Sequence, residues 1–389
     1  MNSHPSRIMI IAGEASGDFH ASRLVDSILE QSPNVSFSGM GGAQMQSAGV
    51  DILHSCENIS VTGFLDAIKV IPELRKIRSD LVEYAIEKSP DIVIFVDFPG
   101  FNTNLVRKLK KNLVKSQMVY FIPPQIWGWR PARAKKIADF FDLVLTIFPF
   151  EKQFFEKYNV HAHYIGNPIC FELMNKTKTG LSKEHFGIDD SYKIIAFVPG
   201  SRKKELNRHL PHMIDAARIL HPEFSKTVFV ISEANSLPKG IIDSALLNSE
   251  KFILPYRGEL SELLGVADFA VVSSGTASLE ASVMGLESIL LYRTDFITYL
   301  LCKYFLMRVD YVGLTNLIIG EEVVPELLQR KVNGVEIANS VRKILEGRKN
   351  TEEKKSYIKD IRKKLSSSDP YKNASEIILE DWFVNAQSP

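Results

Sequence analysis

The chain has 389 residues. A single hydrophobic core rarely supports a chain of this length, so two domains are expected. Hydrophobic residues make up 45% and charged residues 24%, as in an average soluble globular protein, and a formal net charge of +1 gives no basis for nucleic-acid binding. The three cysteines lack the spacing of a zinc site or a redox pair, which predicts reduced thiols.

Short apolar runs recur along the chain, each followed by a loop and then by apolar residues at helical spacing. This alternation predicts an α/β protein with parallel sheets and crossover helices. The polar stretch 175–192 favours a domain junction, so we predict two Rossmann-like domains facing one another across a cleft. The predicted strands are residues 7–12, 35–39, 91–96, 117–122 and 143–147 in the first half, and 194–198, 227–231, 269–273 and 288–292 in the second.

The first predicted strand leads into a loop of small and charged residues, 13–18, and then into a helix. The loop has neither the Lys-Ser/Thr pair of a P-loop nor the GxGxxG pattern, and its two carboxylates would repel a phosphate. Two interpretations remain open. Ser16 or Asp18 caps the helix in a tight turn, or the loop is the polar wall of a cleft, with Glu14, Asp18 and His20 available for acid–base chemistry or hydroxyl contacts.

Asp97 follows the predicted strand 91–96 directly and begins the segment DFPGFN, which ends at Asn102. Doubly wound sheets bind their ligands at the carboxyl ends of the strands, where a carboxylate can act as a general base. The alternative is that Asp97 caps the next helix.

A proline- and tryptophan-rich loop, 123–130, follows the next predicted strand. Its tandem prolines restrict the backbone, and tryptophans are costly to leave in water. The loop therefore either packs on the domain surface or lines an apolar or sugar-binding wall, to which Gln125 and Trp127 would contribute.

Two small-residue loops in the second half suit an anion better than the first loop does. Ser201 and Arg202 follow the strand 194–198, with Glu205 beyond them. A helix N-terminus offers free N–H groups, and Arg202 adds a bidentate phosphate donor. The second loop follows the strand 269–273 and consists of Ser274, Gly275 and Thr276, with Glu280 one turn later as a candidate ribose acceptor. Together the two loops predict a nucleotide-diphosphate site.

The region 61–78 carries apolar residues at helical spacing with basic residues among and after them. A helix that faces the core and an interfacial helix on anionic lipid both explain this pattern. No uncharged segment approaches the roughly 20 residues that cross a bilayer, so no span is expected. The candidate membrane contacts are Phe64, Leu65, Ile68, Lys69 and Arg75.

Taken together, the motifs resemble those of the lipid-A-disaccharide synthase family, glycosyltransferases of the GT-B type. Gly313 and Thr315 depart from the serine and proline of the family's YVSLPN segment, while Asn316 stays in register. The ordered set that carries the resemblance covers nearly the whole chain: AGEASGD at 12–18, GMGG at 39–42, VDFPGFN at 96–102, PPQIWGWR at 123–130, PGSRKKE at 199–205, SGTASLE at 274–280, DYVGLTNLI at 310–318 and VVPELLQ at 323–329.

The resemblance implies a first domain of residues 1–172, completed by a C-terminal helix at 366–389, and a second domain of residues 173–365 that holds the UDP-sugar donor. It implies an inverting transfer from UDP-2,3-diacylglucosamine to 2,3-diacylglucosamine 1-phosphate. The chain has no apolar-flanked DxD motif, which agrees with a mechanism that needs no metal or other cofactor. It also implies a peripheral protein on the cytoplasmic face of the inner membrane, and a homodimer is possible.

The same resemblance implies roles for the candidate residues. Asp97 is the first choice for the base, with Glu14, Asp18 and His20 in reserve. The acceptor side would comprise Ser16, Asn102, Gln125 and Trp127, and the UDP side Ser201, Arg202, Glu205, Ser274, Gly275, Thr276, Glu280 and Asn316. Two alternatives remain: another GT-B-like enzyme of UDP-sugars, such as an epimerase, and a non-catalytic protein that binds nucleotide sugars.

Overall fold

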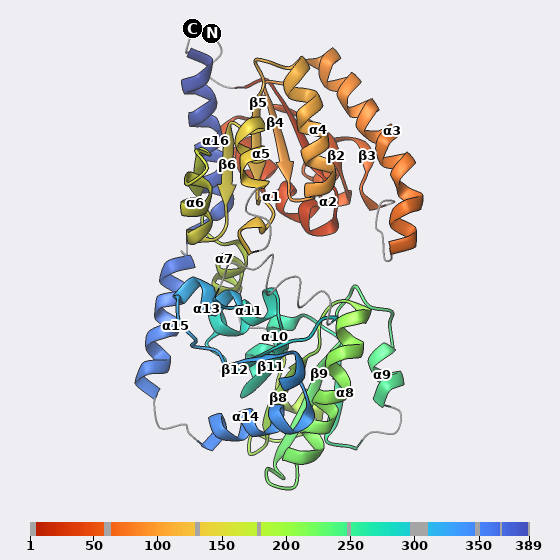
Figure 1. Cartoon of the computed structure of the whole chain (residues 1–389), viewed down its shortest axis with the longest axis vertical. Helices are drawn as coiled ribbons and strands as arrows, with labels where there is room; N and C mark the ends of the chain where they lie inside the picture. The colour runs from red at the N-terminus through yellow and green to blue at the C-terminus, as the bar shows by residue number, and fades with distance from the viewer. Residues whose placement is uncertain are drawn as a thin grey trace. The chain divides into compact units, whose positions relative to one another are not determined.

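The computed structural model describes residues 5–57, 64–128, 133–176, 180–246, 250–295, 310–346, 351–365 and 368–387, and leaves the side chains of 64–70, 128, 351–355 and 385–387 undescribed. The chain forms two compact units. The first comprises Met1–Pro168 and Ser368–Pro389, and the second Ile169–Ser367. The chain therefore passes between the units twice, and its last helix belongs with the first domain (Figure 1).

The described part of the first domain contains a parallel sheet of seven strands in the order β3-β2-β1-β4-β5-β6-β7. The order reverses between β1 and β4, which pair in register from Ile8 with Ile92 to Ala12 with Val96. The strands are β1 Arg7–Ala12, β2 Ser36–Gly41, β3 Asp51–Ser55, β4 Ile92–Val96, β5 Gln117–Phe121, β6 Leu143–Thr146 and β7 Ala162–Tyr164.

Helices cover both faces of this sheet, which explains why its central strands are continuous apolar runs. In β1, Ile8 and Ile10 join a core with residues of α1 and α16, while Met9 and Ile11 join a core with residues of α3, α4 and α5. The helices are α1 Ala15–Gln31, α2 Ala43–Ser47, α3 Phe64–Lys88, α4 Pro99–Asn112, α5 Arg133–Phe140, α6 Pro149–Glu156 and α16 Pro370–Gln387, with a 3₁₀ turn η2 at Ile126–Gly128.

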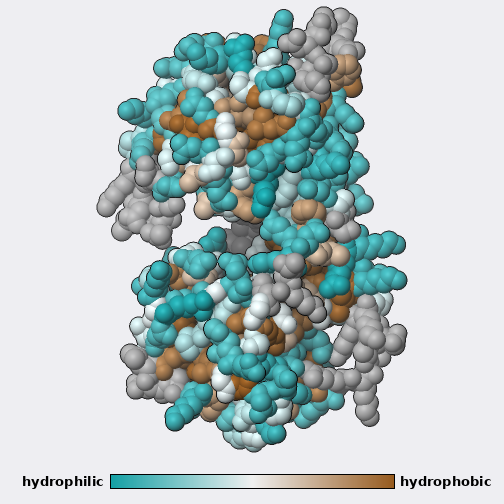
Figure 2. All heavy atoms as spheres, turned by 180° about the vertical axis from the view of Figure 1, so that it is seen from behind, coloured by the Kyte–Doolittle hydropathy of each residue, from teal (hydrophilic) through white to brown (hydrophobic). Residues whose placement is uncertain are grey.

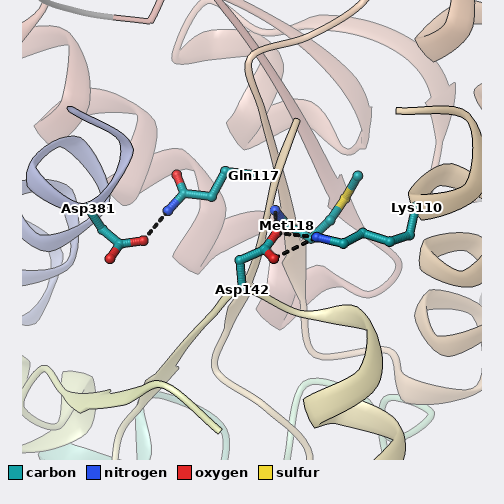
Figure 3. Close-up of polar contacts among 5 residues, drawn as sticks. All are labelled: Lys110, Gln117, Met118, Asp142 and Asp381. Atoms are coloured by element: carbon teal, nitrogen blue, oxygen red, sulfur yellow. Dashed lines mark hydrogen bonds and ion pairs between the residues drawn. The ribbon is translucent and has the colours of Figure 1, made fainter. Parts of the chain in front are cut away.

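Polar contacts fix the amino end of β5 to its surroundings (Figure 3). The Asp142 carboxylate accepts the backbone N–H of Met118 at 2.8 Å and pairs with the Lys110 ammonium at 2.6 Å. On the other side, the Gln117 amide donates to Asp381 of α16. The interior strand β5 is thus bonded, through Asp142 and Gln117, to both α4 and the C-terminal helix α16.

The described part of the second domain has a parallel sheet of six strands in the order β10-β9-β8-β11-β12-β13, which reverses between β8 and β11. The strands are β8 Lys193–Val198, β9 Thr227–Ser232, β10 Ile253–Tyr256, β11 Phe269–Ser273, β12 Ser288–Tyr292 and β13 Glu326–Leu328. The helices are α7 Pro168–Asn175, α8 Lys203–Leu220, α9 Ile241–Leu246, α10 Leu260–Val266, α11 Thr276–Met284, α13 Leu314–Ile319, α14 Gly334–Glu346 and α15 Thr351–Leu365, with 3₁₀ turns at Lys183–Phe186 and Gln329–Lys331.

All nine predicted strands are present, within two residues at either end. The prediction of a domain junction at 175–192 is wrong for the described residues 180–192. Leu181, Phe186, Ile188 and Tyr192 pack against the core of the second domain. These apolar side chains attach an otherwise polar stretch to the core cluster that contains residues of β8, β9 and β11.

Candidate active site

The first candidate cluster lies at the point where the first sheet reverses its strand order. Because Ala12 and Val96 are paired neighbours in β1 and β4, the Gly13 loop and Asp97 leave the sheet at the same edge. Glu14 is the N-cap residue of α1, and its side chain is exposed. Ligands of doubly wound folds bind at such a reversal, so this edge is a candidate ligand site.

The backbone of Asp97 has an unfavourable conformation, which persists only where surrounding contacts hold it. Both Asp97 and Phe98 lie in the left-handed region, with φ of 42° and 44°. The Phe98 ring occupies the space beside Gly13, where an added Cβ would approach Phe98 Cδ1 to 2.2 Å. A glycine at 13 is therefore required by this packing, and non-glycine residues in such conformations are typical of functional sites.

The electrostatics of Asp97 suit a base. Burial, and secondarily the negative charge of Glu14, raises the pKa of Asp97 from 3.8 to about 6. A carboxylate with this pKa is mostly ionised at neutral pH, yet it is more basic than an ordinary aspartate. The nearby Asn102 side chain is fully buried and donates to the carbonyl oxygens of Val96 at 3.3 Å and Asp97 at 2.8 Å. The Asn102 amide thus holds the backbone of the turn that carries Asp97.

Asp18 has a structural contact that the sequence did not indicate. Its carboxylate is 4% exposed and accepts the backbone N–H groups of Gly42, Gln44 and Met45 at 2.7, 3.1 and 3.1 Å. Asp18 therefore caps the N-terminus of α2 and not that of its own helix. These bonds occupy both carboxylate oxygens.

His20 lies one turn into α1 and contacts the C-terminal helix. Its Nδ1 is 2.9 Å from the Tyr371 hydroxyl of α16. Burial lowers the pKa of His20 from 6.5 to about 4, so the imidazole is neutral at physiological pH. Ser16, in contrast, is exposed in the first turn of α1.

The tryptophan loop is held by a buried carboxylate that the sequence analysis did not single out. Trp127 Nε1 donates to Glu151 Oε1 at 2.9 Å, and the indole meets the Phe150 ring edge-on at 4.7 Å between centroids. The other Glu151 oxygen accepts the backbone N–H of Phe148 at 3.1 Å. Gln125 is exposed in the same loop.

The second candidate cluster lies where the second sheet reverses its order, between β8 and β11. A cavity of about 400 Å³ opens at the carboxyl ends of the strands β8 to β11. Six residues named from the sequence line it: Ser201, Arg202, Glu205, Ser274, Gly275 and Thr276. Gly200 and Gly275 have φ of 122° and 146°, which glycine adopts without strain.

The charges of this cavity are mixed. Arg202 has 83% of its side chain exposed and lies 3.5 Å from Glu205, whose other oxygen accepts the Ser201 N–H at 3.1 Å. Arg202 is thus available to an incoming anion and tethered only loosely. Other lining residues, which were not predicted, come from the end of β9 and from the loops after β9 and β10; they include Ser232, Glu233, Asn235, Gly258 and Glu259.

Glu280 and Asn316 are not among the lining residues of this cavity. Burial, followed by the charge of Glu259, raises the pKa of Glu280 from 4.5 to about 7. Asn316 is fully buried and bonds to both backbone N–H groups of Val323 and Val324 and to the Glu326 carboxylate. Asn316 therefore fixes the loop before β13, and Thr315 beside it bonds to the Ser282 hydroxyl at 2.8 Å.

The predicted membrane contacts Phe64, Leu65, Ile68 and Lys69 lie outside the described side chains. Further along α3, Arg75 is exposed and Ile71 is 41% exposed, whereas Ile77 and Leu81 belong to the core. Among the described residues, no helix is long and apolar enough to cross a membrane. On the face shown in Figure 2, hydrophobic residues form separate patches among hydrophilic ones.

Known proteins resemble this chain over almost its full length. The family described as lipid-A-disaccharide synthetase matches residues 8–379. The lipid-A-disaccharide synthase of Myxococcus xanthus is 35% identical over 97% of this chain and 98% of its own, and that of Geobacter metallireducens is 33% identical over 96% and 97%.

Solved structures resemble the fold at low sequence identity. CalG4, the calicheamicin glycosyltransferase, superposes with a TM-score of 0.61 at 12% identity and covers all of both chains. The UDP-GlcNAc 2-epimerase of Neisseria meningitidis gives 0.58 at 14% identity, over 96% of this chain and 98% of that one. The predicted GT-B fold of two Rossmann-like domains is confirmed.

Proposed function

Because the chain belongs to the lipid-A-disaccharide synthase family, a family of glycosyltransferases, we propose that it joins UDP-2,3-diacylglucosamine to 2,3-diacylglucosamine 1-phosphate. The products are UDP and a β-1′,6-linked disaccharide 1-phosphate. The observation that carries the proposal is the family match over residues 8–379. This range includes both candidate clusters, the one around Asp97 and the one around Arg202.

An α-linked donor that gives a β product is inverted in a single in-line displacement. Such a step needs a base at the acceptor 6-hydroxyl and stabilisation of the negative charge that develops on the departing UDP. In our proposal Asp97 accepts the hydroxyl proton as the bond to the sugar C1 forms. Its raised pKa supports this role. Of the reserve candidates, Asp18 is occupied by three backbone bonds, which disfavours it as the base.

The leaving diphosphate would bind in the cavity of the second domain. Arg202 and the free N–H groups that begin α8 and α11 would neutralise its charge, an arrangement that requires no metal ion. Glu280 of α11 and Asn316 of α13 do not line the cavity. They would act on the donor indirectly, through the loops that precede α11 and β13. We also propose a peripheral association with the inner membrane, in which α3 meets the anionic surface.

The direct test mixes the purified protein with both diacylated substrates in dispersing detergent and measures UDP and the tetraacyl disaccharide phosphate by mass spectrometry. We expect both products in equal amounts, with EDTA leaving the rate unchanged. Turnover of UDP-GlcNAc without a lipid acceptor would instead indicate an epimerase. UDP binding with no product would indicate a non-catalytic binding protein.

A further inference from the structure

A buried tyrosine on the interior strand β5 contacts the segment that carries Asp97. Tyr120 is fully buried, and its hydroxyl donates to the carbonyl oxygen of Asp97 at 2.9 Å. Its ring stacks on Phe141 with 4.5 Å between the centroids. The apolar packing explains the aromatic ring, but it does not explain the hydroxyl, which phenylalanine would lack.

The carbonyl that accepts this bond belongs to the strained turn. Asp97 and Phe98 are both left-handed, and such residues persist only where several contacts fix them. The same carbonyl accepts the Asn102 amide at 2.8 Å, so two buried donors from different elements hold one oxygen. Rotation of this peptide would change the direction of the Asp97 side chain.

The strand that carries Tyr120 is itself fixed. Its preceding residues, Gln117 and Met118, are bonded to Asp381 and Asp142, as Figure 3 shows. Tyr120 also pairs in register with Phe95 of β4, two residues before Asp97. A donor on a rigid central strand can define the position of a catalytic group more closely than a loop residue can.

We propose that Tyr120 is a positioning residue, whose hydroxyl fixes the Asp97 backbone and so directs the Asp97 carboxylate toward the acceptor hydroxyl. The inference rests on the proposed function of Asp97. In this proposal Tyr120 acts through the Asp97 backbone and does not contact the substrate. Its hydroxyl remains a donor throughout, because burial raises the pKa of Tyr120 well above its ordinary value.

Tyr120→Phe tests the proposal because it removes one oxygen and keeps the stacked ring. We expect kcat to fall roughly tenfold to a hundredfold, as for a small displacement of a catalytic group. The KM for the UDP-sugar donor should stay unchanged. The negative charge of Glu14 contributes to the raised pKa of Asp97, after burial. If the carboxylate turns away from Glu14, the acid limb of the kcat profile moves to lower pH.

The matched control is Tyr158→Phe, which deletes a hydroxyl from a tyrosine packed against the same core. It should leave kcat and the acid limb as in the wild type. If Tyr120→Phe lowers only the melting temperature and leaves both kinetic quantities unchanged, the tyrosine is merely structural and the inference is wrong.

If Tyr120→Phe does not fold at the assay temperature, its kcat is measured at a lower temperature at which its circular dichroism matches that of the wild type. A kcat equal to that of the wild type under those conditions would overturn the inference. The variant Asp97→Asn separates the role of Asp97 as the base from the positioning role of Tyr120. Full activity of Asp97→Asn would refute the base assignment itself, whereas an inactive Asp97→Asn beside a wild-type-like Tyr120→Phe refutes the positioning role alone.

Discussion

At the residue scale, burial makes two carboxyl groups unusually basic in the described part of the first domain. Asp97 has a pKa of about 6 and Glu151 of about 7, in both cases chiefly through loss of hydration. Their surroundings differ. Asp97 lies beside the exposed Glu14 at an open strand end, whereas Glu151 is 1% exposed and its oxygens accept three N–H groups. The first suits proton transfer, and the second suits the fixing of a loop.

The Asp97 environment predicts the pH dependence of the reaction. A base must be ionised, so kcat/KM should fall as the pH drops through about 6. Glu14→Gln removes a negative charge that raises this pKa, and it should therefore move the acid limb to lower pH. Initial rates of UDP release between pH 5 and 8 measure the effect. Asp26→Gln, at an exposed acid on α1, is the control and should leave the limb in place. An unchanged limb in Glu14→Gln would show that Asp97 does not set it.

The Glu151 environment predicts a dependence of stability on pH. Its pKa is raised from 4.5 to about 7 in the folded protein, so its stabilising contribution is full below pH 4.5 and is lost as the pH rises through 7. The loss is about 3 kcal/mol or less. Glu151→Gln should remove this part of the slope in urea unfolding between pH 5 and 8. Glu156→Gln, on an exposed position of the same helix, should keep the slope. Parallel slopes in both variants would contradict the assignment.

The sequence was a partial guide to these residues. Asp97, Arg202 and the Gly275 loop were found because each follows an apolar strand directly. Glu151 and Tyr120 were missed because a single buried polar residue inside a helix or strand has no local pattern. Their roles depend on partners from other elements, such as Trp127 for Glu151. The Asp18 contact with α2 was missed for the same reason: its three N–H partners are 24 to 27 residues away.

At the element scale, burial decided which strands the sequence revealed. The nine predicted strands include all the central ones, which are buried on both faces. The four that were missed, β3, β7, β10 and β13, are the edge strands of the two sheets. An edge strand has one bonded neighbour and tolerates polar residues and proline, as in DILHS of β3 and ILPY of β10. The apolar run that identifies a central strand is therefore absent.

The C-terminal helix predicts a further element-scale result. Ile378 of α16 is fully buried in the core that α16 shares with α1. Ile378→Ala should destabilise the protein by about 2–5 kcal/mol. Val384→Ala, at a position 63% exposed on the same helix, should change stability by less than about 0.5 kcal/mol. Urea unfolding followed by circular dichroism compares them. Equal stabilities would show that α16 contributes little to this core.

At the scale of the whole molecule, the two domains have separate core clusters, and we propose separate roles for them. Among the described residues, two core clusters belong to the first domain and two to the second, and the two pairs share no residue. The proposed base comes from the first domain, and the loops proposed to bind the diphosphate come from the second. Binding of the nucleotide can therefore be measured independently of proton transfer.

The proposed division of roles between the two domains predicts where UDP binds. At 100 times its Kd, UDP should stabilise the domain that binds it by about 2.7 kcal/mol. We expect hydrogen-exchange protection in the 199–205 and 273–277 loops, which line the cavity, and none in the 13–18 loop. Arg202→Ala should weaken UDP binding roughly tenfold to a hundredfold, since a charged hydrogen bond is lost. Arg330→Ala, at an exposed arginine of the same domain, is the matched control and should bind UDP normally. Protection confined to the 13–18 loop would instead place the nucleotide in the first domain and reverse the assignment of the two sites.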